Sequence, residues 1–392
     1  MRILYVTPRF PYPLDRGDKL KEFNLIKYLS KNNSVSLLSF TEGKEEDSVD
    51  CLKDYCEKLH MVHRSKYGGY LRALLSLFTL QPLQVAYYSS VKMKKLVKNI
   101  IETENYDVVL VQLIRMAPYL FQYSVKKVLA IEDAISLVLE KRYRNSFGLQ
   151  NLVWYMENLK VKRFEKKVLD RFNSFTLVSE RDKEVFKKYS NYDNISVIPN
   201  GVDVDYFGYR GPSTENGNLV FVGKMSASYN IDAVTFFANQ IFPLIRKEVP
   251  QVKFYIVGAT PHRKVLDLAN NRDIFVTDFV EDLRPYLHNA VCFVCPLRFG
   301  GGIQNKVLEA MACGTPVITT TIGADGIGAI VDGAMVIEDD PEEFASKTIN
   351  LISDLERRKQ MSAKAREIVE RNYSWSEKVN QLEKLLLKTC NK

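Results

Sequence analysis

The sequence has no run of 18 apolar residues, so no segment has the length of a membrane-spanning helix. Its opening apolar run, MRILYVTP, is too short for a signal peptide and leads directly into Arg9 and a proline-rich loop. Internal repeats, low-complexity segments and the signatures of helix-turn-helix, RNP and zinc-finger proteins are also missing. We therefore expect a cytoplasmic protein, and nucleic acid is the least favoured partner.

Cysteines are few and scattered, at positions 51, 56, 292, 295, 313 and 390. Cys292 and Cys295 form a CxxC pair, but the segment around them is apolar, and no second pair or nearby histidine completes a zinc site. The pair therefore predicts buried thiols.

The composition is that of an ordinary globular protein, with 46% hydrophobic and 26% charged residues. A chain of 392 residues predicts two domains. The net charge of +8 is divided unevenly, with +10 in residues 1–200 and −2 in residues 201–392. A basic first half favours a phosphorylated substrate or an anionic membrane as its partner.

Short apolar runs alternate with helical periods in both halves, which predicts an α/β fold of two doubly wound domains. We expect an N-terminal domain over 1–195, a linker over 196–218, a C-terminal domain over 219–372 and a final helical segment over 373–392. Strands are expected at 2–7, 34–40, 60–64, 106–112, 126–133, 174–180, 219–225, 252–258, 273–280, 290–296 and 334–340, and helices at 20–30, 154–170, 232–245 and 303–312.

The stretch RFGGGIQNKVLEAMACGTP, residues 298–316, combines three glycines, basic side chains and a helix start. It follows a buried strand, and Gly314 with Pro316 ends the helix that begins near Ile303. A glycine loop before a helix directs backbone N–H groups and the positive helix end at one place. We therefore expect an anion there, bound by Gly300, Gly301, Gly302 and the helix start.

Charged side chains refine this expectation. Arg298 and Lys306 can reach the same place, and two cations suit a diphosphate better than a carboxylate. Glu309, one turn further along, would accept hydrogen bonds from a ribose diol. The alternative is a glycine run that only permits a tight turn, followed by a solvated ion pair between Lys306 and Glu309.

Polar residues also follow two predicted strands of the first half. Arg16, Gly17, Asp18 and Lys19 follow the first strand, where a phosphate-bearing or hydroxyl acceptor could bind. A solvated helix start is the alternative. Glu132 and Asp133 end a later strand, at the edge where catalytic or substrate-orienting groups lie in doubly wound folds.

The segment YLRALLSLFTL, residues 70–80, is apolar on most sides and is flanked by basic residues. One interpretation is an interfacial segment on an anionic membrane, and the other is a core helix.

Three motifs in this order, IPNGVD at 198–203, FVGKM at 221–225 and KVLEAMACGTPVI at 306–318, resemble the family-4 retaining glycosyltransferases of the GT-B fold. PLRFGGGIQNKVLE and PYPLDRGDKLKEFNLIKYL are similar to sugar transferases of bacterial exopolysaccharide and exosortase systems. The resemblance implies two Rossmann-like domains facing a central cleft, with the last helix crossing back to the first domain.

By the same resemblance, Lys224 matches a basic residue on the donor diphosphate, and Gly258 with the backbone near Phe279 and Val280 would cradle the nucleobase. Two positions depart from the family. Gly301 stands where a glutamate usually lies eight residues before the match to Glu309, and Tyr229-Asn230 replaces a second lysine. Arg298 and Lys306 would take over these roles. Glu132 or Asp133 lies near the place where many relatives carry a histidine.

The resemblance implies a retaining, metal-independent glycosyltransferase of EC 2.4 type. It would move a sugar from a nucleotide-diphosphate sugar to a glycan or polyprenyl-diphosphate-linked acceptor, in the cytoplasm or peripherally on the inner membrane. No cofactor is expected. Asp203 and Asp205 form a DxD pattern, but its position after a turn at a domain junction disfavours a metal site. A nucleotide-sugar epimerase of the same fold and a non-catalytic donor-binding partner are the alternatives.

Overall fold

The computed structural model describes residues 1–14, 17–43, 49–189, 194–214, 217–300, 302–327 and 333–391. The chain forms two compact units, and each is described separately below. The first unit contains Met1–Pro199 and Val379–Lys392, and the second contains Asn200–Lys378. Residues 200–218 of the expected linker therefore belong to the second unit.

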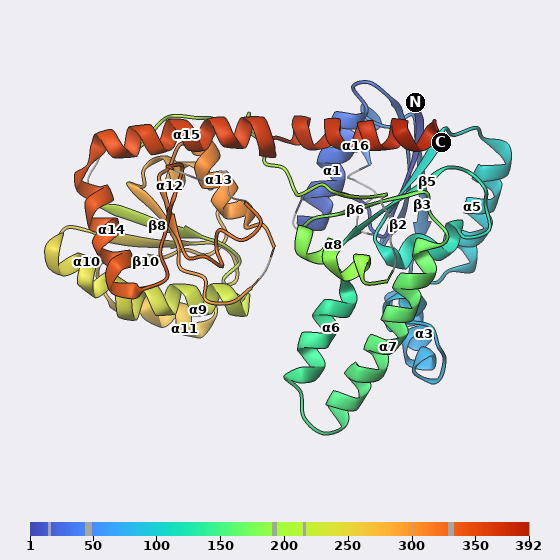
Figure 1. Ribbon diagram of the computed structural model, residues 1–392, viewed down its shortest axis with the longest axis horizontal. Coiled ribbons are helices and arrows are strands. Elements are labelled where there is room, and N and C mark those ends of the chain that lie inside the picture. The colour runs from blue at the N-terminus through green and yellow to red at the C-terminus, as the bar shows by residue number, and fades with distance from the viewer. Residues whose placement is uncertain are drawn as a thin grey trace. The chain divides into compact units, whose positions relative to one another are not determined.

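Within the described residues, the first unit has a parallel sheet with the strand order β3-β2-β1-β4-β5-β6-β7. Both faces of this sheet carry helices (Figure 1). The strands are β1 (Arg2–Thr7), β2 (Ser34–Thr41), β3 (Lys58–His63), β4 (Val108–Gln112), β5 (Lys127–Glu132), β6 (Ser174–Leu177) and β7 (Ile195–Val197). Every residue of β4 is buried, as expected for a central parallel strand covered on both faces.

Helices of the first unit pack around this sheet or extend beyond it. They are α1 (Gly17–Leu29), α2 (Asp50–Lys53), α3 (Lys66–Leu75), η2 (Ser76–Phe78), α4 (Leu83–Tyr87), α5 (Val91–Thr103), η3 (Ile114–Leu120), α6 (Ile135–Arg144), α7 (Leu149–Leu169), α8 (Glu180–Lys187) and most of α16 (Trp375–Cys390). In Figure 1, α3, α6 and α7 extend away from the sheet.

The end of α16 is fixed to the first unit by side-chain hydrogen bonds. Asn33 Nδ2 donates to Glu383 Oε1 at 2.6 Å, and the hydroxyls of Ser174 and Thr389 are 2.8 Å apart. Leu382 and Leu386 are buried on the same helix. The last described residues of the chain therefore contribute to the core of the first unit.

The described part of the second unit has a second parallel sheet, with the order β10-β9-β8-β11-β12-β13. Its strands are β8 (Asn218–Val222), β9 (Lys253–Val257), β10 (Ile274–Val276), β11 (Cys292–Cys295), β12 (Val317–Thr319) and β13 (Val336–Ile337). Its helices are α9 (Ser228–Phe236), η4 (Phe237–Ile241), α10 (Phe242–Glu248), α11 (Arg263–Leu266), η5 (Asp267–Asn270), α12 (Arg284–His288), α13 (Asn305–Cys313), α14 (Pro341–Ser353) and α15 (Leu355–Tyr373).

The helix expected over 232–245 is divided into α9, a π-helical turn η4 and α10. Pro243 lies at the start of α10. Because proline has no backbone N–H, it cannot continue an α-helical hydrogen-bond ladder, and the preceding turn widens.

The order of strands reverses next to the first strand of each sheet, between β1 and β4 and between β8 and β11. In doubly wound sheets, ligands bind outside the carboxyl ends of the strands at such a point. The loops after these four strands are therefore where binding residues are expected. Among the described helices, none is long and apolar enough to cross a membrane.

Candidate functional site

The loops after β8 and β9 are packed backbone to backbone in the second unit. Gly258 has φ +145°, and a Cβ built on it would lie 1.9 Å from the carbonyl oxygen of Gly223. The backbone N–H of Gly258 donates to Thr277 Oγ1 at 3.2 Å, which also joins the loop after β10. Only glycine fits at position 258, and this close contact fixes the loops after β8 and β9 relative to each other.

Lys306 lies in the first turn of α13, with 8% of its surface exposed. Its Nζ atom donates to Asn230 Oδ1 and lies 4.5 Å from the centre of the Phe221 ring and 5.5 Å from that of Tyr229. Burial lowers the pKa of Lys306, and the neighbouring Cys295 and Glu309 partly oppose this. The Lys306 ammonium is therefore buried and directed at Asn230, so the alternative of a solvated ion pair with Glu309 does not hold.

Asn230 belongs to the candidate site, although the sequence analysis did not name it as a binding residue. It is 2% exposed, its Oδ1 accepts from Lys306, and its Nδ2 donates to the Lys224 carbonyl at 3.0 Å. One side chain thus joins the loop after β8 to the start of α13. The available signal was its position, since Tyr229-Asn230 stands where the related transferases carry a lysine. Lys306 places its ammonium beside these two residues.

The other two predicted cations of this unit differ in their surroundings. The Arg298 guanidinium binds both carboxylate oxygens of Asp232, with Nε 2.9 Å from Oδ2, and lies 4.5 Å from the centre of the Phe236 ring. Half of the Arg298 side chain is exposed. Lys224 is exposed and makes no ion pair with any described carboxylate. Lys224 is therefore the more available of these two cations, and Arg298 acts together with Asp232.

The glycine loop after β11 has backbone conformations that favour glycine. Gly300 has φ +140° and Gly302 has φ +74°, and a Cβ at either position would meet open space. The requirement for glycine there is conformational rather than steric. Gly301 lies outside the described residues. Ile303 is partly buried against the core of the second unit, and Gly314, with φ +83°, ends α13 as predicted.

Glu309 is partly buried on α13, one turn after Lys306. Burial raises the pKa of its carboxyl group to about 7, although the charge of Lys306 acts in the opposite direction. No described residue hydrogen-bonds to this carboxyl group, which leaves it available to a ligand.

The predicted nucleobase region lies on the loop after β10. Phe279 is 72% exposed, and Val280 packs partly against the core. Asp278 Oδ1 accepts from the backbone N–H groups of Phe279 at 2.8 Å and Thr260 at 2.9 Å. The Phe279 amide is thus already engaged, whereas its exposed ring is free to stack on a planar group.

In the first unit, Glu132 is held by two donors at the end of β5. Lys21 Nζ is 2.7 Å from its Oε2, and Gln112 Nε2 donates to its Oε1 at 2.9 Å. Its backbone has φ +71°. Asp133 lines a cavity of about 220 Å³ together with Arg115. Burial, with the charges of Asp182 and Glu132, raises the pKa of Asp133 to about 6.

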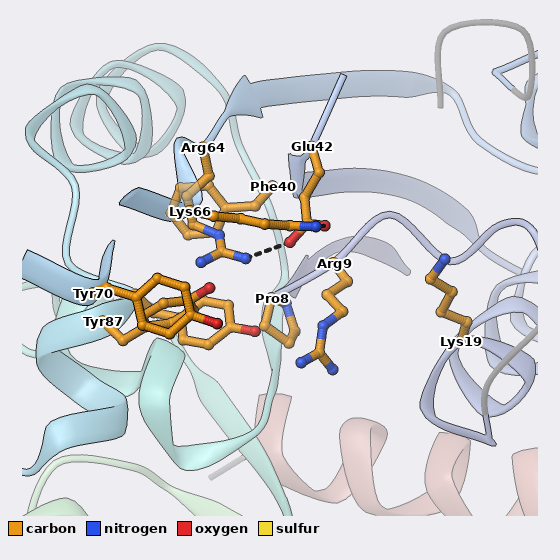
Figure 2. A pocket seen from close by; sticks show the side chains of 10 residues that line it. Pro8, Arg9, Lys19, Phe40, Glu42, Arg64, Lys66, Tyr70 and Tyr87 are labelled. Carbon is orange, nitrogen blue, oxygen red and sulfur yellow. Dashed lines mark hydrogen bonds and ion pairs between the residues drawn. The ribbon is translucent and has the colours of Figure 1, made fainter. Parts of the chain in front are cut away.

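The predicted acceptor residues after β1 are divided among several environments. Arg16 lies outside the described residues, and Gly17 begins α1. Asp18 forms an ion pair with Arg9. Lys19 lines a second cavity, of about 330 Å³, at the carboxyl ends of β1, β2 and β3 (Figure 2).

Glu22 is a buried acid of α1 that sequence reasoning missed. It is fully buried, and neither carboxyl oxygen has a hydrogen-bond partner among the described residues. Burial, followed by the charges of Asp18 and Glu132, raises its pKa well above the usual value. A charged residue in the middle of a helix ordinarily faces solvent, so no sequence signal indicated this burial.

The two motifs with metal-binding patterns have structural roles. Asp203 Oδ1 accepts from the backbone N–H groups of Asp205 and Tyr206, at 3.1 and 2.9 Å, and so closes a turn. Cys292 and Cys295 are fully buried free thiols, as predicted.

Comparison with known proteins places these features in context. Residues 216–354, which include the loops of the second unit, match the family described as "Glycosyl transferases group 1". The chain is 24% identical over 389 residues to an uncharacterized 44.6 kDa protein in the cps region of Klebsiella pneumoniae, covering 95% of this chain and 96% of that protein.

A second relative is the GDP-mannose-dependent monoacylated alpha-(1-6)-phosphatidylinositol monomannoside mannosyltransferase of Corynebacterium glutamicum. It is 26% identical over 271 residues, covering 63% of this chain and 68% of that protein. Among solved structures, Anabaena HepE in complex with UDP has a TM-score of 0.67 at 16% identity, covering 99% of this chain and 100% of that one. The α/β fold with GT-B architecture is thereby confirmed.

Proposed function

We propose that the protein is a glycosyltransferase that moves a sugar from a nucleoside-diphosphate sugar to an acceptor hydroxyl. The proposal depends mainly on Lys306, a buried lysine in the first turn of α13 whose ammonium group donates to Asn230. Its ammonium lies among the loops that follow β8 and β11, on either side of the point where the strand order reverses. A buried cation at this place suits the diphosphate of a donor.

The proposed chemistry depends on charge that develops on the donor diphosphate. When the anomeric C–O bond breaks, the sugar gains oxocarbenium character, and the leaving diphosphate gains negative charge. Lys306, Lys224 and the Arg298–Asp232 pair, with the amides of Gly300–Gly302, would stabilise this charge without reorganising. The two lysines supply positive charge, and the Arg298 guanidinium and the backbone amides supply hydrogen-bond donors, so we propose a reaction that needs no metal.

The remaining parts of the donor would contact the residues beyond Lys306. The Glu309 carboxylate would accept hydrogen bonds from the ribose hydroxyls, and the exposed Phe279 ring would stack on the base. The nucleotides named for the relatives, GDP-mannose and UDP, support a nucleoside-diphosphate sugar as the donor class.

The first unit would bind the acceptor. Asp133, with its pKa of about 6, would orient the acceptor hydroxyl by accepting its hydrogen bond, and Glu132 would hold Lys21 in place. Retention of anomeric configuration is the stereochemistry we propose, with the leaving phosphate taking the acceptor proton. No cofactor takes part in this scheme.

The proposed setting is the synthesis of a surface polysaccharide or glycoconjugate in the cytoplasm. The relative in a cps region supports it. A glycan or a polyprenyl-diphosphate-linked saccharide is the proposed acceptor, reached by peripheral contact with the anionic inner membrane. The charge excess of the first half, +10 over residues 1–200, favours such contact.

A thermal-shift screen with UDP, GDP, ADP and TDP tests the donor site. A nucleotide at 100 times its Kd should raise the free energy of unfolding by about 2.7 kcal/mol. With the corresponding sugar donor, Lys306→Ala should lower turnover by about 10²–10³. Lys359→Ala is the surface control, because Lys359 is a half-exposed lysine of α15 paired with Glu356.

Three results would contradict the proposal. The first is unchanged nucleotide affinity and turnover in Lys306→Ala. The second is release of an epimerised donor, and the third is donor binding with neither transfer nor hydrolysis across a panel of acceptors.

A further inference from the structure

The cavity at the carboxyl ends of β1, β2 and β3 has a basic lining. Among the residues that the structure describes, four cationic side chains line it, Arg9, Lys19, Arg64 and Lys66, together with one carboxylate, that of Glu42. In Figure 2, the Arg64 guanidinium lies between Glu42 and the rings of Tyr70 and Tyr87, with Arg9 and Lys19 across the pocket from these rings. The cavity volume of about 330 Å³ exceeds what a lone phosphate ion would fill.

Arg64 is the central residue of this pocket. Only 4% of its surface is exposed, and its guanidinium carbon lies 4.5 Å from the centres of both the Tyr87 and Tyr88 rings. Its Nη2 donates to Glu42 Oε1 at 2.6 Å, but its Nε and Nη1 atoms have no partner in the described part of the chain. The Tyr88 hydroxyl, equally buried, also lacks one. Buried donors without acceptors are costly, which indicates that a ligand supplies the acceptors.

Glu42 shows which kind of ligand the pocket suits. Its Oε1 accepts from Arg64, and its Oε2 lies 2.8 Å from Lys66 Nζ, so one carboxylate already bridges two cations. An incoming anion with more oxygens and a higher charge would compete for both. Phosphate esters have these properties, and arginine binds them through paired hydrogen bonds.

We propose that this pocket binds the phosphate or diphosphate group of a phosphorylated acceptor. The inference rests on the proposed function, in which the first unit binds the acceptor. Tyr70 connects the pocket to the exposed leucines of α3, since it lines the pocket and is itself 65% exposed. A lipid-linked diphosphate could therefore place its head group in the pocket and its chain along α3. A soluble sugar phosphate is the other source of the same chemistry.

Calorimetric titration of the full-length protein with inorganic diphosphate, geranyl diphosphate and glucose 1-phosphate tests this proposal. Lys66→Ala and Arg64→Met should each weaken diphosphate binding by roughly ten- to hundredfold, because each removes charge-assisted hydrogen bonds. Lys98→Ala is the matched control, since Lys98 is exposed to a similar extent on α5. Tighter binding of geranyl diphosphate than of glucose 1-phosphate would identify a lipid ester, and the reverse order a sugar phosphate.

The donor site of the second unit also binds diphosphate under the proposed function, so Lys306→Ala is titrated in parallel. Diphosphate binding that is lost in Lys306→Ala and unchanged in Lys66→Ala would overturn the inference while leaving the proposed function intact. Lys66→Ala decides the test if Arg64→Met does not fold, because the Lys66 side chain is 57% exposed. If the wild-type protein binds no nucleotide, this result would instead contradict the proposed function.

Discussion

Asn230 shows how one side chain organises the candidate donor site. Its amide accepts from Lys306 and donates to the Lys224 carbonyl, so it joins two loops that both carry a predicted cation. Asn230→Ala should therefore lower donor affinity and turnover by about ten- to hundredfold, because the buried ammonium loses its polar partner. Steady-state kinetics with Asn99→Ala as a surface control checks this. A variant with normal kinetics would show that Lys306 needs no such partner.

Glu309 should make both stability and donor binding depend on pH. Its pKa is raised by burial to about 7 in the folded protein, so between the ordinary value near 4.5 and 7 the folded state holds a proton that the unfolded state has released. This carboxyl group therefore lowers the free energy of unfolding as pH rises through that range. Glu309→Gln should be more stable than the wild type at pH 8, by about 3 kcal/mol, and equal to it near pH 4.

Urea denaturation at several pH values measures this difference. Donor affinity should show the opposite trend in the wild type, because only the ionised carboxylate accepts both ribose hydrogen bonds. Affinity should therefore fall as pH drops below 7, and Glu309→Gln should abolish this dependence. A pH-independent difference in stability between the two proteins would contradict the assignment.

Which individual residues could be predicted depended on whether their role was local. The role of Gly314 was predictable, because a glycine that follows a helical pattern readily adopts the left-handed conformation that ends a helix. The partners of Lys306 and Arg298 were not, since Asn230 and Asp232 lie 76 and 66 residues away in sequence. Spacing indicates which side chains share a helix face, but it does not indicate which distant helix they meet.

At the scale of elements, the parallel strands were predictable because burial on both faces gives continuous apolar runs. β1, over Arg2–Thr7, lies where it was expected. The α6–α7 region was predicted less well. α7 begins at Leu149, earlier than the expected helix over 154–170, and α6 was not expected. Phe147 and Leu149 are 89% and 83% exposed there, so the apolar residues do not mark a buried helix face.

These exposed residues belong to an apolar patch on the first unit. We define it by Leu71, Leu74, Leu75, Phe78 and Leu80 near α3 and by Phe147, Leu149, Leu152 and Met156 near α7. Lys160 of α7 donates to the carbonyls of Ser76 and Leu77, so the segment after α3 lies beside the part of α7 around Lys160. The alternative of a core helix over 70–80 was wrong, since most of these side chains are more than half exposed.

The apolar patch should bind anionic vesicles. Leu74→Ser with Phe78→Ser should reduce flotation with phosphatidylglycerol vesicles by about tenfold or more, because each buried leucine or phenylalanine contributes about 1.5–3 kcal/mol. Leu266→Ser, an exposed leucine of the second unit, is the control. High salt should also weaken binding, as expected for lysine-assisted attachment. Flotation that ignores lipid charge, or survives the double substitution, would contradict membrane contact.

At the scale of the whole molecule, a two-domain α/β protein could be predicted from the length of the chain and from the alternation of short apolar runs with helical patterns. The exact bounds of the units could not be predicted. Residues 200–218, which were expected to form most of a linker, belong to the second unit. Arg366 Nη1, for example, donates to the Phe207 carbonyl at 2.9 Å. Composition indicates turns and loops, but it does not indicate what a loop packs against.

Truncation after Lys378 should unfold the first unit selectively. It removes Val379, Leu382 and Leu386, which are 4%, 3% and 0% exposed, and the hydrogen bond between the Ser174 and Thr389 hydroxyls. The loss should be on the order of 5 kcal/mol or more for the first unit. Nucleotide binding by the second unit should persist. Calorimetric unfolding checks this, with truncation after Cys390 as the control, and an unchanged transition would refute the role assigned to α16.

The second unit also has its two chain ends next to each other. Val202 and Ser374 form a parallel bridge, and the backbone N–H groups of Val202 and Trp375 bond to the carbonyls of Tyr373 and Val202. The second unit, the 179 residues from Asn200 to Lys378, is therefore an insertion in the sequence of the first unit, and its first and last residues lie close together. If this insertion is replaced by the matching segment of a relative, the chimaeric protein should have the nucleotide preference of the relative. It should still use the acceptor of the original protein.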